Sequence, residues 1–385
     1  MMHRVVRLGQ VVDINPSTKA AGSADDLVSF LAMADISEQG RVASVQKRPL
    51  AEVQKGYTVF QTGDVLLAKI TPCFENGKAA LVESLPTQVG FGSTEFHVLR
   101  PTKEIDPKFL FHLVWNFNFR RLGATRMTGS AGQKRVPVAF LIDYEFSLPS
   151  LKEQQRITTI LDKADSLRCK RKEAIRLADD FLRATFIDLF GDPVTNSFGW
   201  PIQPLASIGT LDRGVSKHRP RNDPSLLDGD YPLIQTGDIA NCDGYIRAFT
   251  STYSEKGLKQ SKLWPPGTLC ITIAANIAKT GILLFPACFP DSVVGFSAAD
   301  RPTVEYVRFW LSFLQQTLEA KAPASAQKNI NLAILRELQI PVPPRDRVER
   351  FAAAVDNVEA IRKAQRLALY EGQKLRHALE RSLLT

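Results

Sequence analysis

The sequence predicts an α+β protein with two similar globular α/β domains, whose sheets are curved and mostly antiparallel. The domains are separated by an antiparallel coiled coil of two long helices, with pseudo-twofold symmetry. Three observations support this prediction. A set of residues occurs twice at one offset, short β-type segments recur in the same order in both halves, and a long amphipathic helix follows each group of segments.

The internal repeat has a constant offset of 194 residues, as positions 133 and 327, or 162 and 356, indicate. A repeat of this length indicates two copies of one unit, each a domain followed by a helix. Two similar units favour a pseudo-twofold molecule, and the partner of matching symmetry that we expect is duplex DNA. The matched pairs are Gln133-Lys134 with Gln327-Lys328, Leu141 with Leu335, Leu148-Pro149 with Val342-Pro343, Ile157 with Phe351, Leu161-Asp162 with Val355-Asp356, and Leu167-Arg168 with Ile361-Arg362.

The bulk composition is that of an ordinary globular protein. The chain has 385 residues, of which 44% are hydrophobic and 23% charged, so we expect two or three domains with separate cores. No apolar run approaches the roughly 18–20 residues that span a bilayer, and the N-terminus lacks the apolar region of a signal peptide. We therefore expect a cytoplasmic protein with no membrane partner.

Cysteine usage and net charge narrow the class of function further. The five cysteines are scattered and form no CxxC pair, which favours reduced thiols over a disulfide framework or a structural zinc site. The net charge of +9 permits a polyanionic partner without requiring one.

The first half is expected to contain short strands followed by a helix. Turn signals such as Asn76-Gly77 separate the β-type segments, and this spacing predicts a compact curved sheet. From residue 107 to residue 121 the apolar residues follow the 3.6-residue period, which predicts one helix. The expected strands are 11–14, 30–33, 57–60, 65–70, 79–82 and 96–99.

The second half repeats this order at offsets that drift between about 197 and 204. Residues 205–212 correspond to 8–15, residues 267–271 correspond to 63–67, and a helix is expected at 304–318. The offset is constant only toward the end of each unit. We therefore expect the long helices to form a common frame and the two domains to bind different ligands.

Each domain is followed by a long amphipathic helix. Its apolar residues recur in steps of three and four, which is the pattern of a coiled-coil seam, although a surface helix packed on its own domain is an alternative. The first helix, residues 157–190, would be a rod of roughly 50 Å that ends at Gly191-Asp192-Pro193. Arg171 and Gln365 interrupt the two seams at matching positions. The expected seam residues are Ile157, Ile160, Ala164, Leu167, Ala174, Ala178 and Phe181, and Phe351, Ala354, Val358, Ile361, Ala368 and Leu375.

These features resemble the DNA specificity subunit of type I restriction–modification systems, over essentially the whole chain. The resemblance rests on the order and duplication of its motifs, which are Gln133-Lys134, residues 148–157, residues 189–193 with Trp200-Pro201, and the strand at residues 63–66 with its repeat. It implies target recognition domains at residues 1–149 and 193–343, and conserved spacer helices at residues 150–192 and 344–385.

In that family each domain reads one half of a split double-stranded DNA site, and the coiled coil is both spacer and dock for two methyltransferase subunits. Restriction and translocase subunits join the same assembly. The resemblance therefore implies a non-catalytic chain without cofactors, with S-adenosylmethionine, ATP and magnesium on partner subunits. One departure is that Glu153-Gln154 has Arg347-Val348 as its counterpart, which would make the two docking surfaces unequal.

Other functions remain as alternatives. One alternative is a methylation-only or related system, and another is a coiled-coil scaffold whose domains bind peptides rather than DNA. A stand-alone enzyme has little support, because the sequence lacks HExxH, GxxxxGK, GxGxxG and the Asn/Asp-Pro-Pro-aromatic motif of amino-methyltransferases. Asp291, Glu319 and Lys321 resemble a nuclease triad, but the last two fall at the end of an expected helix.

Nucleic-acid binding is expected in basic and hydroxyl-rich loops, because phosphates require cations and loop donors while arginine reads guanine in the major groove. Lys69–Thr71 and Ala278–Thr280 are expected at corresponding strand ends, and the densest basic loop is residues 213–221. A solvated charged loop is the alternative in each case. The candidates are Lys69, Thr71, Arg126, Ser130, Gln133, Lys134, Arg213, Lys217, Arg219, Arg221, Lys279, Thr280, Ser325, Gln327 and Lys328.

Overall fold

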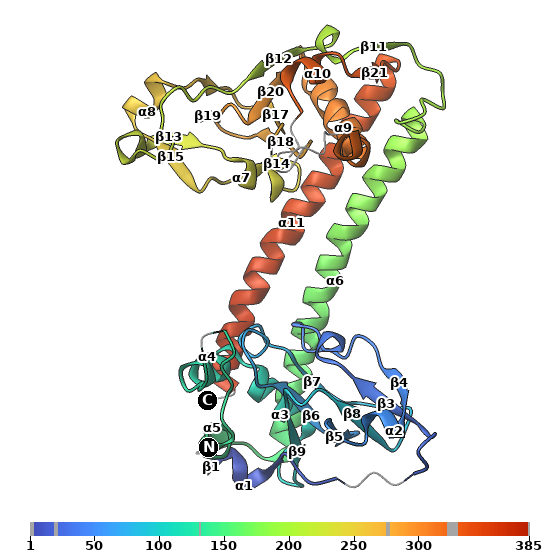
Figure 1. The fold of residues 1–385 in the computed structure, drawn as a ribbon, viewed down its shortest axis with the longest axis vertical. Helices are drawn as coiled ribbons and strands as arrows, with labels where there is room; N and C mark the ends of the chain where they lie inside the picture. Colours follow the sequence, from blue (N-terminus) through green and yellow to red (C-terminus); the bar gives the residue numbers. More distant parts are fainter. Residues whose placement is uncertain (1–3, 19–21, 131, 275–277, 322–329, 384–385) are drawn as a thin grey trace. The chain divides into compact units, whose positions relative to one another are not determined.

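The computed structural model describes residues 4–18, 22–130, 132–274, 278–321 and 330–383 (Figure 1). The chain divides into two compact units. The first consists of Met1–Arg171 with Leu367–Thr385, and the second of Lys172–Arg366. Two long helices, α6 (Leu151–Phe190) and α11 (Arg345–Leu383), each contribute to both units. We call the part of unit 1 before α6 domain 1, and the part between α6 and α11 domain 2.

Domain 1 contains two four-stranded sheets. The first has the order β2 (Val12–Ile14), β9 (Phe96–Pro101), β6 (Val65–Ala68), β7 (Ala79–Leu81), with antiparallel neighbours throughout. The second has the order β4 (Gln46–Pro49), β3 (Leu27–Leu31), β8 (Val89–Gly92), β5 (Thr58–Gln61), and β3 and β8 are parallel. A separate pair joins β1 (Arg4–Arg7) to β10 (Glu145–Leu148).

The helices of domain 1 are short. They are α1 (Leu8–Val11), η1 (Met33–Asp35), α2 (Leu50–Val53), α3 (Pro107–Trp115), α4 (Phe117–Thr125) and α5 (Val138–Asp143). The single helix predicted over residues 107–121 is wrong, because Asn116 adopts a non-helical backbone (ψ 140°) and its side chain accepts from the Asn118 amide. Asn116 therefore caps α4 and separates it from α3.

Domain 2 repeats the topology of domain 1. One sheet has the order β12 (Thr210–Arg213), β20 (Val293–Ser297), β17 (Leu269–Thr272), β18 (Thr280–Leu283), β14 (Tyr245–Ile246). The other has the order β15 (Ser251–Tyr253), β13 (Leu227–Leu233), β19 (Ala287–Cys288), β16 (Leu263–Trp264), with β13 and β19 parallel. Strands β11 (Ile202–Pro204) and β21 (Gln339–Pro341) pair as β1 and β10 do. The predicted duplication of an α/β domain is therefore confirmed, with β14 beside β18 as an addition to the domain 2 sheet.

The helices of domain 2 are η2 (Leu205–Ser207), η3 (Pro224–Leu226), α7 (Thr236–Ala240), α8 (Glu255–Lys259), α9 (Arg301–Lys321) and α10 (Leu332–Arg336). The helix predicted at residues 304–318 is the central part of α9. In the part of the chain that the structure describes, no helix is long and apolar enough to cross a bilayer.

The long helices pack into the cores of the units as well as against each other. In unit 1, Ile157 and Leu161 of α6 are buried in the core that contains Phe109 and Leu113 of α3. In unit 2, Phe186 of α6 lies against Phe351 of α11, with ring centroids 5.3 Å apart. Each fully buried side chain of this size contributes about 1.5–3 kcal/mol. Pairing and packing on the domain, which the sequence left as alternatives, therefore occur together.

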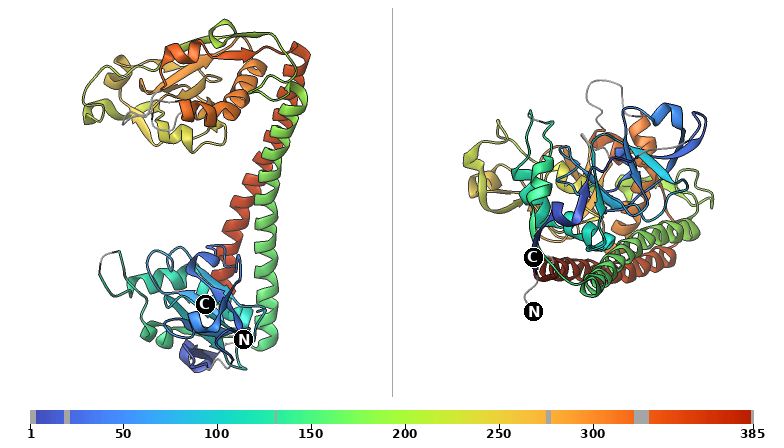
Figure 2. Two further views of the ribbon diagram at one scale, coloured as in Figure 1. Left: turned by 45° about the vertical axis from the view of Figure 1, so that its right-hand side comes forward. Right: turned by 90° about the horizontal axis from the view of Figure 1, so that it is seen from below.

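Within each unit, helices α6 and α11 are antiparallel, as predicted, and lie side by side (Figure 2). Within unit 1, Asp165 pairs with Arg376, and Arg171 Nη1 donates to the Ala368 carbonyl over 2.5 Å. A later residue of α6 therefore contacts an earlier residue of α11, as expected for antiparallel helices. Helix α6 begins at Leu151 rather than at residue 157, and it ends before Gly191 (φ +78°), where a helix stop was expected.

The predicted seam is only partly correct. Ile157, Phe351 and Val358 are buried, Ala178 and Ala354 are partly buried against the core, and Ile160, Ala164, Ala174 and Ala368 are also partly buried. The assignment is wrong for Leu167, Phe181, Ile361 and Leu375, which are more than half exposed. Leu161, Leu182, Phe186 and Val355 are buried instead. The step pattern alone did not distinguish them, because ion pairs rather than apolar contacts occupy part of the helix interface.

Gln154 anchors the beginning of α6 to domain 1. Its side chain is fully buried, Oε1 accepts from the Asp106 amide over 2.7 Å, and Nε2 donates to the carbonyls of Glu104 (3.0 Å) and Pro149 (2.9 Å). The position 194 residues later is Val348, which packs in the core of unit 2. The difference between the two copies is thus a polar anchor in one unit and an apolar anchor in the other.

We predict that Gln154→Ala lowers the free energy of unfolding by about 1–3 kcal/mol, because it leaves the buried Pro149 carbonyl, the Glu104 carbonyl and the Asp106 amide without this partner. Chemical denaturation of the full chain measures the change. The neighbouring Gln155 is exposed, so Gln155→Ala is the matched control and is expected to change stability by less than about 0.5 kcal/mol. Equal effects of the two substitutions would contradict the anchor.

Candidate nucleic-acid interface

The candidate residues of domain 1 come together on one hairpin and the strand end beside it. Thr128 and Arg135 exchange two backbone hydrogen bonds (3.0 and 2.8 Å), and the Gln133 amide donates to the Ser130 carbonyl over 3.0 Å. The second arm of the hairpin then pairs with the end of β6. The Thr71 amide donates to the Lys134 carbonyl, and the Val136 amide donates to the Lys69 carbonyl, both over 2.9 Å.

The hairpin presents its polar side chains to solvent. Ser130, Gln133 and Lys134 are exposed, and Arg126 is exposed at the end of α4, directly before the hairpin. Two of its glycines have positive φ, Gly129 at 121° and Gly132 at 81°, which a residue with a side chain adopts only with strain. The sequence analysis had named Arg126, Ser130, Gln133 and Lys134 as candidates, and the structure adds the pairing that holds this segment beside the end of β6.

Two carboxylates stabilise this segment. Arg135 donates to Glu95 through Nε (3.0 and 3.2 Å) and Nη2 (2.8 Å), and its Nη1 donates to the Gln133 carbonyl over 3.1 Å. The hydrogen bonds from Arg135 lower the pKa of Glu95. Thr71 donates its hydroxyl to Glu75 over 3.0 Å. Thr71 and Arg135 therefore hold the hairpin in place, while Lys134, Gln133 and Arg126 stay available to a ligand.

The basic loop of domain 2 is organised around one carboxylate, Asp291. Arg219 and Arg221 form ion pairs with its two carboxylate oxygens, and Arg213 Nε donates to its backbone carbonyl. The loop backbone is held separately, because Gln260 Oε1 accepts from the amides of Lys217 (2.6 Å) and His218 (3.0 Å). The loop is thus ordered by specific contacts rather than being only a solvated run of charges.

The expected correspondence between Lys69 and Lys279 is wrong. In domain 2 the Ile330 amide donates to the Ile273 carbonyl over 3.0 Å, as the Val136 amide does to Lys69, so Ile273 is the counterpart of Lys69. Lys279 corresponds to Lys78, because the carbonyl of each accepts from the backbone amide of the last residue of the neighbouring strand, β17 in domain 2 and β6 in domain 1. Lys279 and Thr280 therefore lie at the start of β18, where Lys78 and Ala79 lie at the start of β7. The candidates Ser325, Gln327 and Lys328 fall outside the described residues.

The two domains share a feature that the sequence did not reveal. The segment directly before β9 carries Glu95, the segment directly before β20 carries Asp291, and each carboxylate holds one or more arginines. The arginines come from different places, a hairpin before α5 in domain 1 and the loop after β12 in domain 2. No spacing pattern indicated these pairs, because each joins residues far apart in the chain.

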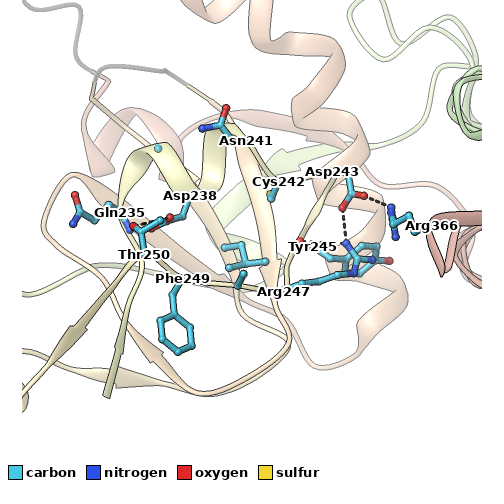
Figure 3. Close-up of a pocket in the computed structure, with 13 residues that line it drawn as sticks. Gln235, Asp238, Asn241, Cys242, Asp243, Tyr245, Arg247, Phe249, Thr250 and Arg366 are labelled. Carbon is cyan, nitrogen blue, oxygen red and sulfur yellow. Dashed lines mark hydrogen bonds and ion pairs between the residues drawn. The ribbon is translucent and has the colours of Figure 1, made fainter. Parts of the chain in front are cut away.

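Domain 2 also contains a pocket of about 620 Å³ beside α11 (Figure 3). Its acidic groups are paired, since Asp243 binds Arg247 and Arg366, and Asp238 accepts from Thr250 over 3.1 Å. Burial raises the pKa of the Cys242 thiol, which disfavours the nucleophilic thiolate. Cys242 is therefore not an activated nucleophile in this pocket.

In the described part of the chain, no group of three His, Cys, Asp or Glu residues is arranged to hold a metal ion. In the nuclease-like set, Asp291 is occupied by arginines and Glu319 lies within the helix α9. The interpretation of that set as a coincidence is consistent with this arrangement.

Comparison with known proteins gives one family. The family model for the type I restriction modification DNA specificity domain matches twice, at residues 4–177 and 199–369. The specificity subunits of the type I restriction enzymes EcoEI and EcoAI from Escherichia coli are both 39% identical, over 160 and 166 residues. These alignments cover 41% and 42% of this chain but only 27% and 28% of the relatives, so the matched part spans about a quarter of their length.

Two solved structures share the fold over almost the entire chain. One comes from work on complex assembly and conformational transition of the type I R-M system, with 22% identity, a TM-score of 0.60, and coverage of 99% of this chain and 97% of the other. The other is a type I restriction-modification S subunit from M. genitalium, with 13% identity, a TM-score of 0.59, and coverage of 99% and 96%.

We predict that Glu95→Ala lowers the amide hydrogen-exchange protection of residues 128–130 and 132–136 without unfolding the β6 sheet, because Arg135 of the hairpin loses its hydrogen bonds to Glu95. Hydrogen exchange with mass spectrometry measures this, with the exposed Glu52→Ala as control. Because the folded-state pKa of Glu95 lies below its ordinary value, the pairing with Arg135 is fully present above pH 4.5 and is lost as the pH falls through the lowered pKa. Unchanged protection in Glu95→Ala would exclude this role.

Proposed function

We propose, because this chain belongs to the type I restriction modification DNA specificity family, that it is the subunit that reads a bipartite duplex DNA site. Each domain would bind one half-site, and the chain itself would carry out no chemistry. The observation that carries this proposal is the duplicated domain, in which each copy presents an exposed basic segment beside the equivalent sheet. Because the two segments differ in sequence and origin, we expect two different half-sites.

The distribution of charged and polar groups supports a division of labour at each half-site. Exposed Arg126 and Lys134 in domain 1 and Lys217 in domain 2 suit phosphate contacts, which carry affinity but no sequence information. Gln133 offers an amide of the kind that pairs with adenine. Affinity is therefore expected to fall steeply with salt, while specificity depends on the loop side chains.

The long helices are proposed as spacer and as dock for two methyltransferase subunits, with restriction or translocase subunits in the same assembly. Large apolar residues remain exposed on both helices, and such residues mark contact surfaces when they cluster. Leu177 and Phe181 are four residues apart on α6, so they share one face, and each is more than half exposed. S-adenosylmethionine, ATP and magnesium would be bound by the partner subunits, and the complex would act in the cytoplasm.

We predict that cells carrying this chain with its methyltransferase partner acquire methylation at a split motif, two short half-sites around a fixed gap. Genome-wide methylation mapping against cells without the chain measures this. Lys134→Ala is expected to lower methylation at all occupied sites and to reduce the salt dependence of binding by about one phosphate contact, without changing the motif. An unchanged methylation pattern, with the partner expressed and active, would favour a scaffold that does not bind DNA.

We predict that the double substitution Leu177→Ser with Phe181→Ser lowers methyltransferase binding at least tenfold while DNA binding by the isolated chain is retained. Both side chains are exposed in the structure, so their loss is expected to leave the fold intact. Titration of labelled methyltransferase subunit measures the affinity, and Asp188→Ser on the same helix is the polar control. Wild-type affinity in the double variant would place the dock elsewhere.

A further inference from the structure

The basic loop of domain 2 contains four cations, and the structure assigns them different roles. Arg219 is occupied on both terminal nitrogens, because Nη1 donates to the carbonyls of Ser216 (2.6 Å) and His218 (2.8 Å), and Nη2 pairs with Asp291 over 3.3 Å. Arg221 uses Nη2 for the other carboxylate oxygen of Asp291. Arg219 therefore stabilises the loop conformation rather than reaching a ligand.

Arg213 differs from these residues in both its backbone and its side chain. It is the last residue of β12, where it pairs with Val294 of β20, so its backbone is part of the sheet. Its Nε donates to the Asp291 carbonyl, which fixes the orientation of the guanidinium plane. Among the residues that the structure describes, no hydrogen bond or ion pair is present at its two terminal nitrogens, and the side chain is exposed.

We propose that Arg213 reads one guanine of the domain 2 half-site. Asp291 positions it through its backbone carbonyl, which accepts from Arg213 Nε, while its carboxylate fixes the same segment through Arg219 and Arg221. This inference rests on the proposed function. Guanine presents O6 and N7 as two adjacent acceptors in the major groove, and the two terminal nitrogens of an arginine match them. A side chain on a strand end with one nitrogen already bonded loses little conformational freedom on binding, which favours discrimination. Lys217, on the loop with a single ammonium group, suits a phosphate.

The corresponding position in domain 1 lacks this group. In domain 2, Leu211 pairs with Phe296, and Phe296 pairs with Leu269 of β17. In domain 1, Ile14 pairs with Leu99 in the same way, and Leu99 pairs with Val65 of β6. Leu211 is therefore equivalent to Ile14, and Arg213 is equivalent to Pro16. The guanine contact is accordingly specific to the half-site that domain 2 reads, and the domain 1 half-site is an internal control.

Arg213→Lys tests the proposal, because it keeps the charge and removes the two-nitrogen fork. With the assembled methyltransferase complex, competition among duplexes that carry single base changes is expected to show about a tenfold to hundredfold loss of discrimination at one guanine only. Discrimination in the domain 1 half-site is expected to stay as in the wild type. Lys217→Ala, the matched control in the same loop, is expected to weaken binding to all duplexes equally.

A modified base gives a second, independent test of the contact between Arg213 and guanine. Replacing the guanine by 7-deazaguanine removes the N7 acceptor, so it is expected to weaken wild-type binding and to have little effect on the Arg213→Lys variant. Asp291→Ala is expected to lower the discrimination at the same guanine. Asp291→Asn is expected to lower it less, because its amide oxygen still accepts a hydrogen bond. A residue with only a structural role would instead lower affinity for every duplex and leave discrimination unchanged.

The outcomes separate the two proposals. If the wild-type complex reads no split motif, the proposed function itself fails. If it reads one but Arg213→Lys keeps full discrimination, or if the domain 2 half-site contains no guanine, the Arg213 assignment is overturned. It is also overturned if Arg213→Ala weakens all sequences equally and lowers the salt dependence, since that is the behaviour of a phosphate contact.

Discussion

Burial of the long helices in the domain cores is the constraint on which the other features depend. Ile157 and Leu161 attach the first part of α6 to the core of unit 1, and Phe186 and Phe351 place both helices in the core of unit 2. Because protein interiors are closely packed, a helix held at such points cannot rotate or slide freely. The helices and the sheets of each unit therefore form one packed body, and the candidate DNA-binding segments lie beside those sheets.

Charged groups occupy much of the helix interface between these apolar anchors. Asp165 pairs with Arg168 and Arg376, and 194 residues later Glu359 pairs with Arg362. Burial raises the pKa of Glu359, so part of the ion-pair energy is spent on desolvation. Such pairs add little net stability, but they specify register, because a shift of the helices would leave buried charges unpaired.

The two candidate DNA-binding segments are each organised by a carboxylate, in different ways. A carboxylate on the segment before the last strand of each sheet organises nearby arginines, Glu95 with Arg135 and Asp291 with Arg219 and Arg221. Paired arginines keep their positive charge while their conformations are restricted, which lowers the entropy lost on binding. The duplicated sheets thus supply a constant platform, and the divergent loops supply different sets of available donors.

The sequence by itself determined the duplication, part of the strand order and the antiparallel long helices, because these depend on periodicity and on a repeat that a single chain displays. It did not determine the break at Asn116, the exposure of Leu167 and Phe181, or the equivalence of Lys69 with Ile273. Those depend on which side chains meet across the fold. Only the tertiary structure decided that Gln154 is a buried anchor and that Asp291 gathers three arginines, because these contacts join residues that no local spacing relates.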